Sequence, residues 1–150
     1  MSSKFPLFFL SNVSNNTELE RLGLRSIHFD ENKNRIEELD LSNNNKLQTL
    51  TLDYNNIQET INISNLTELS LLTISANFYL TSLNLINNTK LIWLDIGFNG
   101  QLNSIDLLSL TELQHLSFRA SSSSFSTLDV SNNNKLVSFD ATFMGDLEIA

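Results

Sequence analysis

The side chains that could do chemistry are few and widely spaced in this sequence. Two histidines occur, His28 and His115, and neither has the spacing of a metal-ligand pair. The chain has no cysteine, which excludes disulfides and Cys-based metal sites. It also has neither a glycine-rich phosphate loop nor a Gly-x-Ser-x-Gly elbow. These features favour a protein that is not an enzyme and that uses no metal or cofactor.

One set of acidic residues does recur at a fixed spacing. Asp40, Asp106 and Asp129 share a repeat position with Asn62 and Asn84. Repeat motifs that bind calcium are richer in Asp and Gly than this column. We therefore interpret the column as a solvated face, with calcium binding as the alternative.

Charge and length restrict the classes of partner. The chain has 150 residues and a formal net charge of -8, and an acidic surface repels phosphate backbones and anionic lipid. No apolar run reaches the ~20 residues that a membrane-spanning helix needs. The composition thus argues against a nucleic-acid partner and against membrane insertion.

A short apolar triplet, Leu-x-x-Leu-x-Leu, repeats along nearly the whole chain. Its middle position is taken by Leu22, Leu39, Leu50, Ile61, Leu72, Leu83, Leu94, Ile105, Leu116, Leu128 and Phe139. From Leu39 onward the step is eleven residues, apart from one step of twelve. Side chains two residues apart point to the same face of a strand, so each triplet predicts a short strand that stacks on its copies.

The eleven-residue units alternate between two kinds, which makes the period 22 residues. We predict a single domain over residues 1–150, with a partial repeat in 1–18 and repeats that start near 19, 47, 69, 91, 113 and 136. Extra residues interrupt the rhythm at 30–35 and 121–124, and both segments read as surface loops.

An asparagine follows the strand in three central repeats, at Asn55, Asn77 and Asn99. The chain must turn inward there, and the turn removes backbone donors and acceptors from water. An amide side chain offers both kinds of partner, so stacked copies can form a hydrogen-bonded ladder. The ladder position holds Ile27, Ser121 and Met144 elsewhere, which predicts weaker end turns.

The repeat resembles the leucine-rich-repeat family, and more closely its bacterial internalin-like, 22-residue class. The segments Asn65-Leu-Thr-Glu-Leu69 and Ser109-Leu-Thr-Glu-Leu113 carry this likeness, and Leu39-Asp-Leu-Ser-Asn-Asn44 resembles Asn-rich repeats of bacterial surface proteins. The resemblance implies an α/β-type repeat solenoid that is mostly β. It also implies a right-handed coil with a parallel concave sheet, short strands or turns on the convex side, and ligand binding on the concave face.

The predicted concave face is mostly small and polar, except at its centre. Leu71, Trp93 and His115 should be neighbours there, about 5 Å apart. Asp95 and Arg119 flank them, and Tyr54 and Phe98 stand further along the strands. These residues predict a ligand-binding surface, because aromatic residues and arginine dominate interface energies. The alternative is that Trp93 only covers its neighbours.

Three functional hypotheses remain open at this point. The first is a non-catalytic scaffold that binds a protein ligand, on a secreted or cell-surface bacterial protein. The second is self-assembly through uncapped ends, because Val13-Ser-Asn-Asn16 and Leu147 to Ile149 both read as parts of repeats. The third is a carbohydrate-binding or enzyme-accessory module that uses Trp93. Phe5 to Leu10 reads as a buried turn, since a signal peptide needs a longer apolar stretch.

Overall fold

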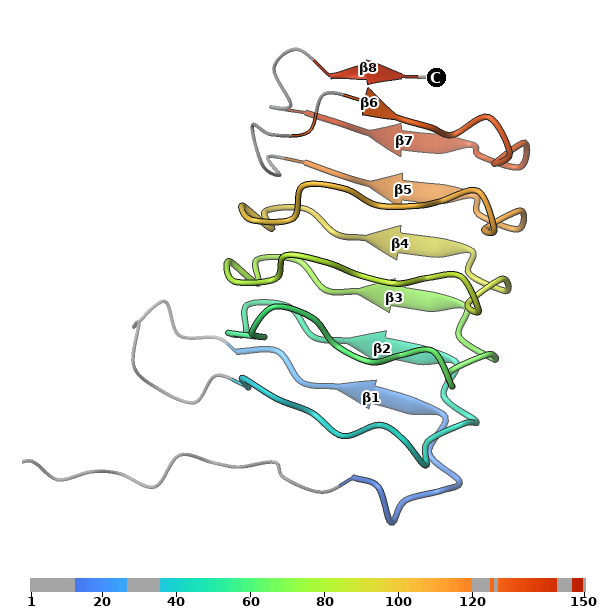
Figure 1. Cartoon of the computed structure of the whole chain (residues 1–150). Helices are drawn as coiled ribbons and strands as arrows, with labels where there is room; N and C mark the ends of the chain where they lie inside the picture. The colour runs from blue at the N-terminus through green and yellow to red at the C-terminus, as the bar shows by residue number, and fades with distance from the viewer. Residues whose placement is uncertain (1–12, 27–35, 120–124, 126, 143–146, 150) are drawn as a thin grey trace, which may run out of the picture.

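Each turn of the chain contributes one short strand to a parallel sheet, and the turns stack into a solenoid (Figure 1). The computed structural model describes residues 13–26, 36–119, 125, 127–142 and 147–149. The main sheet has six strands, in the order β1 (Arg21–Gly23), β2 (Thr49–Thr51), β3 (Leu71–Thr73), β4 (Trp93–Asp95), β5 (His115–Ser117) and β7 (Ser138–Asp140). A second, two-stranded parallel sheet pairs β6 (Thr127–Leu128) with β8 (Glu148–Ile149).

These elements confirm the predicted mostly β solenoid with a parallel sheet. No helix occurs among the described residues, and so none there could cross a membrane. The side opposite the main sheet consists of turns, one isolated bridge between Glu59 and Leu80, and the β6–β8 pair. The two interrupting segments, 30–35 and 121–124, lie outside the described residues, as does the predicted buried turn at Phe5 to Leu10.

The register of the sheet places equivalent repeat positions side by side. Leu50 pairs with Leu72, Leu72 with Leu94, and Leu94 with Leu116. All four leucines are buried, whereas the residues before and after them point to the outer face. The alternation therefore fixes which face of the sheet is inside, because a one-residue slip would expose every leucine.

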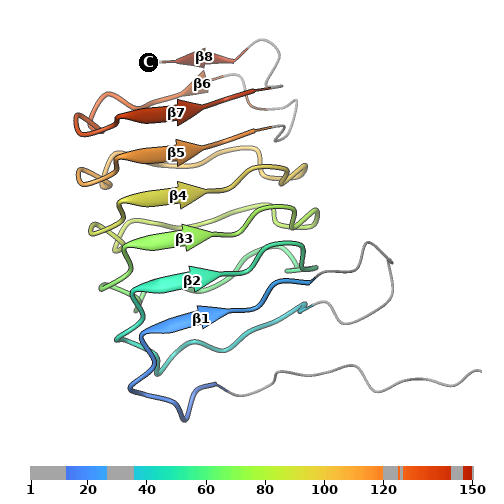
Figure 2. The same ribbon diagram turned by 180° about the vertical axis from the view of Figure 1, so that it is seen from behind.

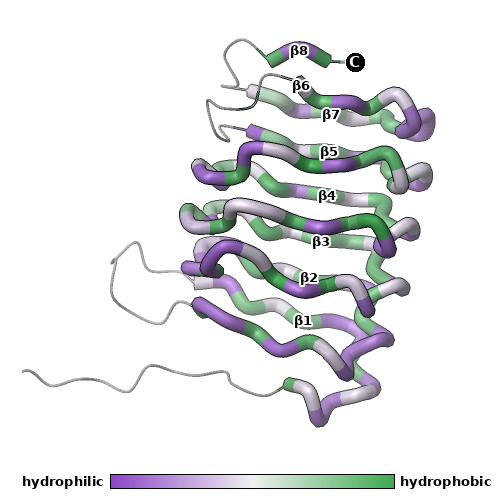
Figure 3. The backbone as a smooth tube through the Cα atoms, in the orientation of Figure 1, coloured by the Kyte–Doolittle hydropathy of each residue, from purple (hydrophilic) through white to green (hydrophobic). Residues whose placement is uncertain are grey.

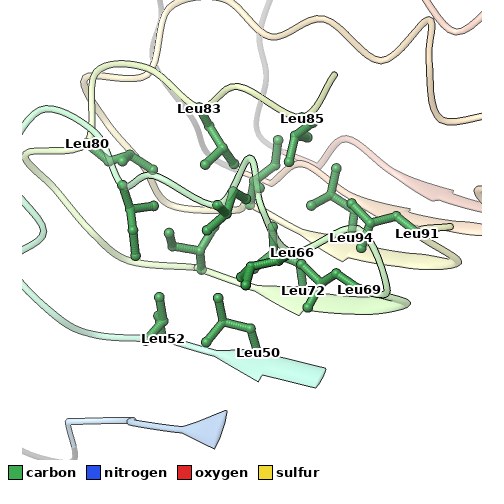
Figure 4. Packing of buried hydrophobic residues seen from close by; sticks show 14 of the residues in the cluster. Leu50, Leu52, Leu66, Leu69, Leu72, Leu80, Leu83, Leu85, Leu91 and Leu94 are labelled. Atoms are coloured by element: carbon green, nitrogen blue, oxygen red, sulfur yellow. The ribbon is translucent and has the colours of Figure 1, made fainter. Parts of the chain in front are cut away.

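The core fills the space between the main sheet and the opposite turns. Figure 4 shows leucines from both sides pointing toward one another, among them Leu50, Leu72 and Leu94 from the sheet and Leu66 and Leu85 from the turns. Hydrophobic and hydrophilic positions alternate along each turn of the tube (Figure 3). Burial of one such side chain is worth roughly 1.5–3 kcal/mol, so the stacked leucines hold neighbouring turns together.

The recurring Asp and Asn column shapes the turns opposite the sheet. In every copy the side-chain Oδ1 accepts a hydrogen bond from the backbone nitrogen two residues later, as from Ser42 to Asp40 at 2.9 Å and from Ser64 to Asn62 at 3.1 Å. This Asx turn needs only the Oδ1 atom, which explains why Asp and Asn interchange. Among the described residues no cluster of His, Asp and Glu could hold a metal ion.

The hydrogen bonds of these turns also favour the ionised aspartates. The pKa of Asp40 is lowered from its ordinary value, mainly by the backbone hydrogen bond from Ser42. The pKa of Asp129 is lowered in the same way, mainly through the Ser131 side chain.

A second set of buried asparagines lies in the turns that precede the strands. Asn44, Asn88 and Asn133 each donate from Nδ2 to two carbonyls of the previous turn; Asn88 donates to Ile63 at 3.1 Å and to Leu66 at 2.9 Å. Leucines take the same position in the intervening repeats, at Leu66 and Leu110. The sequence already separates the segments that end in these asparagines from the Leu-Thr-Glu-Leu segments, and the hydrogen bonds give that difference a physical reason.

Charge alternates in step with these asparagines. The residue before each strand-leading leucine is, in order, Glu18, Lys46, Glu68, Lys90, Glu112 and Lys135. Each lysine contacts the glutamate of the turn before it, with Nζ to Oε2 distances of 2.6 Å in all three pairs. The asparagine of each lysine repeat bonds to the same preceding turn. The structural unit therefore comprises two repeats, or about 44 residues, joined by a buried asparagine and an exposed ion pair.

Candidate functional site

The centre of the outer sheet face holds three neighbouring side chains, Leu71, Trp93 and His115, which we name the concave patch. Strand register places Leu71 beside Trp93 and Trp93 beside His115. Trp93 is 42% exposed, and its ring centroid lies 4.8 Å from that of His115 at an interplanar angle of 31°. Figure 2 views β3, β4 and β5, the strands that carry the patch, from their outer side. The buried Leu94 next in sequence anchors the strand, so the indole stands on a fixed backbone.

Hydrogen-bonded polar side chains border the concave patch. Asp95 accepts hydrogen bonds at Oδ1 from the Ser75 hydroxyl at 2.7 Å and from the backbone nitrogen of Gly97 at 3.1 Å. Asp53, two strands away, accepts from the Ser75 backbone nitrogen at 3.0 Å and from the Thr73 hydroxyl at 3.2 Å. Both carboxylates are thus held in place on the outer face, which lowers the entropic cost of using them to orient a ligand.

Arg119 lies beside these polar side chains. Its guanidinium lies 3.8 Å from Asp95 and 3.6 Å from Asp140, and its central carbon stands 5.6 Å from the ring centroid of Phe98. The pKa of Asp140 is lowered from its ordinary value, chiefly by the Thr142 side-chain hydrogen bond and with a smaller contribution from Arg119. Arg119 therefore links a carboxylate of β4, a carboxylate of β7 and an exposed aromatic ring.

Two aromatic residues and one alanine occupy strained backbone positions where the chain leaves the sheet. Tyr54, Ala76 and Phe98 are equivalent positions in successive turns, and their φ angles are 59°, 56° and 59°. Glycine or asparagine would adopt this left-handed conformation with less strain than Tyr or Phe. Arg25 stands over the Tyr54 ring at 5.0 Å, as Arg119 stands over Phe98. Strain of this kind is found at binding sites, which makes the two rings candidates for ligand contact.

Asn55, Asn77 and Asn99 follow Tyr54, Ala76 and Phe98, and all three asparagines are buried. Asn77 donates from Nδ2 to the carbonyls of Leu52, Ile74 and Ser75 at 2.9, 3.1 and 3.2 Å. Its backbone nitrogen donates to Oδ1 of Asn99 at 2.8 Å, and its own Oδ1 accepts from the nitrogen of Ile57 at 3.4 Å. The amides thus link consecutive turns and hold the backbone beside Tyr54, Ala76 and Phe98. The positions of Ile27, Ser121 and Met144 lie outside the described residues.

The structure brings together most of the residues singled out from the sequence. Leu71, Trp93, His115, Asp95 and Arg119 share the centre of the outer face. Tyr54 and Phe98 instead lie at the edge where the strands end, two turns apart. The arrangement offers stacking, apolar contact and charged hydrogen bonds to a ligand.

Sequence analysis missed two exposed aromatic residues, Phe78 and Tyr79, which follow Asn77 in the turn after β3. The two-residue alternation that assigns faces applies only within a strand, and these residues lie beyond it. Their position after Asn77 could have predicted their exposure, because a residue that follows a buried turn asparagine lies at the outside of the turn.

Comparison with known proteins supports the fold and is silent on a ligand. No protein-family model and no curated protein matches the chain. Among solved structures, an internalin (InlF) from Listeria monocytogenes superposes with a TM-score of 0.53 at 19% identity, over 92% of this chain and 49% of that one. The functional domain of InlJ from Listeria monocytogenes gives a TM-score of only 0.32 at 17% identity, over 91% and 47% of the two chains. The chain spans about half the length of these proteins. The superposition on InlF shows that the chain has the leucine-rich-repeat fold.

Proposed function

We propose that the protein is a non-catalytic scaffold that binds a protein ligand through its concave patch. The observation that carries the proposal is the exposure of Trp93 beside His115 and Leu71, in a field that is otherwise small and polar. A protein interface typically has an aromatic centre and a polar rim, and the patch with Asp95 and Arg119 has both.

The scaffold supports this role through its rigidity. Trp93 begins β4, where the buried Leu94 and the hydrogen-bonded Asp95 follow it, and both neighbouring strands pair with β4 in fixed register. A partner would therefore find the patch already formed, at little cost in ordering. Asp95 and Arg119 would set the partner's register through charge. The likeness of the repeats to bacterial surface repeats favours a secreted or cell-surface location.

Trp93 is the only tryptophan, so its fluorescence reports on the patch directly. The chain would be immobilised, and proteins from candidate host and bacterial surface extracts would be captured on it and identified. Each purified partner would then be titrated against the chain while acrylamide quenching of Trp93 is followed. Docking on the patch should reduce the quenching constant in proportion to the fraction bound.

A matched variant, Ile86→Ala, removes an exposed apolar side chain on the opposite side and should leave capture unchanged. Saturating partner that leaves Trp93 fully accessible to acrylamide would contradict the proposal.

Self-association remains a second candidate, because the outer strand of the main sheet carries exposed apolar side chains. Phe139 on β7 is 36% exposed, although its register partner Leu116 on β5 is buried. Val137 and Ile149 are exposed in the same region. Either a second copy or further repeats of a longer chain would cover this surface. Light scattering across a hundredfold concentration range distinguishes the candidates: a constant monomer mass excludes self-association.

A further inference from the structure

An aromatic rim borders the main sheet at the edge toward which the strands point. Its members are Tyr54, Phe98, Phe78 and Tyr79, from the turns after β2, β4 and β3. Figures 1 and 2 show these three turns side by side. Phe78 is 49% exposed, Tyr79 48% and Phe98 39%, so the apolar surface of the rim is open to contact.

Small residues lie between the rings of the rim. Ala76 lies between Tyr54 and Phe98 in the ladder of turns and retains only 3% exposure. Gly100 is the counterpart of Phe78 in the next turn, and a side-chain carbon added there would meet open space. The Phe78 ring is therefore not screened by a side chain at Gly100.

Guanidinium groups stand over the rings at the two ends of the rim. Arg25 stands over Tyr54 at 5.0 Å, and Arg119 stands over Phe98 at 5.6 Å. Within the described part of the chain, no Lys or Arg side chain stands over Phe78 or Tyr79. The repeat thus presents three aromatic turns in series, and two of them are paired with a guanidinium group of the chain itself.

Acidic residues lie in the turns that precede the middle turn. The Glu59 backbone nitrogen donates to the Tyr79 carbonyl at 3.1 Å, and the Gln58 nitrogen donates to the Glu37 carbonyl at 3.2 Å, which places both glutamates near the rim. Glu37, Glu38 and Glu59 are all exposed. A cation brought to Phe78 and Tyr79 would gain both ring contact and charge attraction.

We propose that the middle of the rim binds an arginine-bearing segment of the protein ligand. The partner's guanidinium would stand over Phe78 and Tyr79, as Arg25 stands over Tyr54 and Arg119 over Phe98. The inference rests on the proposed function, since the rim adjoins the concave patch, and it adds the chemical class of the segment that is recognised.

The probe is a ten-residue peptide of alternating Arg and Ser, titrated into the full chain by calorimetry. Its matched control carries citrulline in place of Arg, which preserves shape and removes charge. We expect the arginine peptide to bind at least ten times more tightly than the citrulline peptide. Equal affinities, or no binding of the arginine peptide, would overturn the inference.

The double variant Phe78→Ala/Tyr79→Ala separates the rim from general attraction to an acidic protein, because it changes no charge. It should weaken binding of the arginine peptide at least tenfold, whereas Ile86→Ala/Leu108→Ala, on the opposite side, should change it less than twofold. Unchanged binding by the rim variant would overturn the inference.

A different measurement tests the proposed function. Trp93→Ala should leave binding of the arginine peptide within twofold, since it leaves the rim intact. If Trp93→Ala still binds the full protein partner, that result contradicts the concave patch but not the arginine site at the rim.

Discussion

The backbone nitrogen of Asn77 donates a hydrogen bond of 2.8 Å to Oδ1 of Asn99, one turn further along the solenoid. The Asn77 amide in turn donates to three carbonyls, so its removal leaves several buried turn groups with fewer partners. We expect Asn77→Ala to lower the free energy of unfolding by roughly 1–3 kcal/mol. Urea unfolding followed by circular dichroism measures this loss.

The control for this ladder is Asn87→Ala, since the exposed Asn87 amide makes one hydrogen bond, to the Ser64 carbonyl. It should cost less than about 0.5 kcal/mol. Equal losses at the two sites would contradict the structural role of the buried ladder.

The buried asparagines that precede the strands should tolerate leucine better than the buried asparagines that follow the strands. Asn88 alternates with Leu66 and Leu110, and all three positions make the same backbone turn. The Ile63 and Leu66 carbonyls that Asn88 contacts also accept backbone hydrogen bonds, so they keep a partner without it. We expect Asn88→Leu to cost at least ~1 kcal/mol less than Asn77→Leu in urea unfolding. The reverse order would contradict the equivalence of Asn88 with Leu66 and Leu110.

The exposed ion pair between Glu68 and Lys90 should contribute little by itself. Exposed pairs are worth roughly 0.2–1 kcal/mol, so Lys90→Glu should destabilise by about that amount and less at high salt. The charge-exchanged variant Glu68→Lys/Lys90→Glu should recover most of the loss. A double-mutant cycle in urea at low and high salt gives the coupling energy, and a coupling of zero in both conditions would show that the pair contributes nothing.

Acid should weaken the fold partly through the turn aspartates. The folded pKa values of Asp40 and Asp129 lie below their ordinary range, because their ionised forms accept hydrogen bonds from Ser42 and Ser131. Their stabilising contribution is therefore present above the unfolded pKa of about 3.9 and is lost as the pH falls through the lower folded values.

The matched test replaces both residues by the amide already found at Asn62 and Asn84. Asp40→Asn/Asp129→Asn should keep the turns and show a smaller decrease in unfolding midpoint between about pH 5 and pH 2 than the wild type. Identical pH profiles would show that the two carboxylates play no part.

Most of the fold could be predicted because the apolar alternation specifies it locally. Leucines such as Leu72 and Leu94 are buried at every strand, so the triplet alone determines inside, outside and parallel register. The same rule predicted that Trp93 would share the outer face with Leu71 and His115.

Features that depend on two turns at once were harder to predict. The alternation of Glu and Lys that pairs Lys90 with Glu68 is visible only when the sequence is compared over about 44 residues. The Asx turn at Asp40 can be recognised only from the turn geometry. The exposure of Phe78 and Tyr79 depends on the turn after Asn77, which lies beyond the strand alternation.

The central claim is that Trp93 carries ligand affinity without carrying stability. The most direct measurement is the dissociation constant of a purified protein partner for the wild type and for Trp93→Ala, by calorimetry, beside their urea midpoints. We expect the variant to lose at least ~2 kcal/mol of affinity with its unfolding midpoint nearly unchanged, while Asp106→Ala, on the opposite side, retains wild-type binding. Wild-type affinity in Trp93→Ala, together with lost binding in Asp106→Ala, would contradict the account and move the site away from the concave patch.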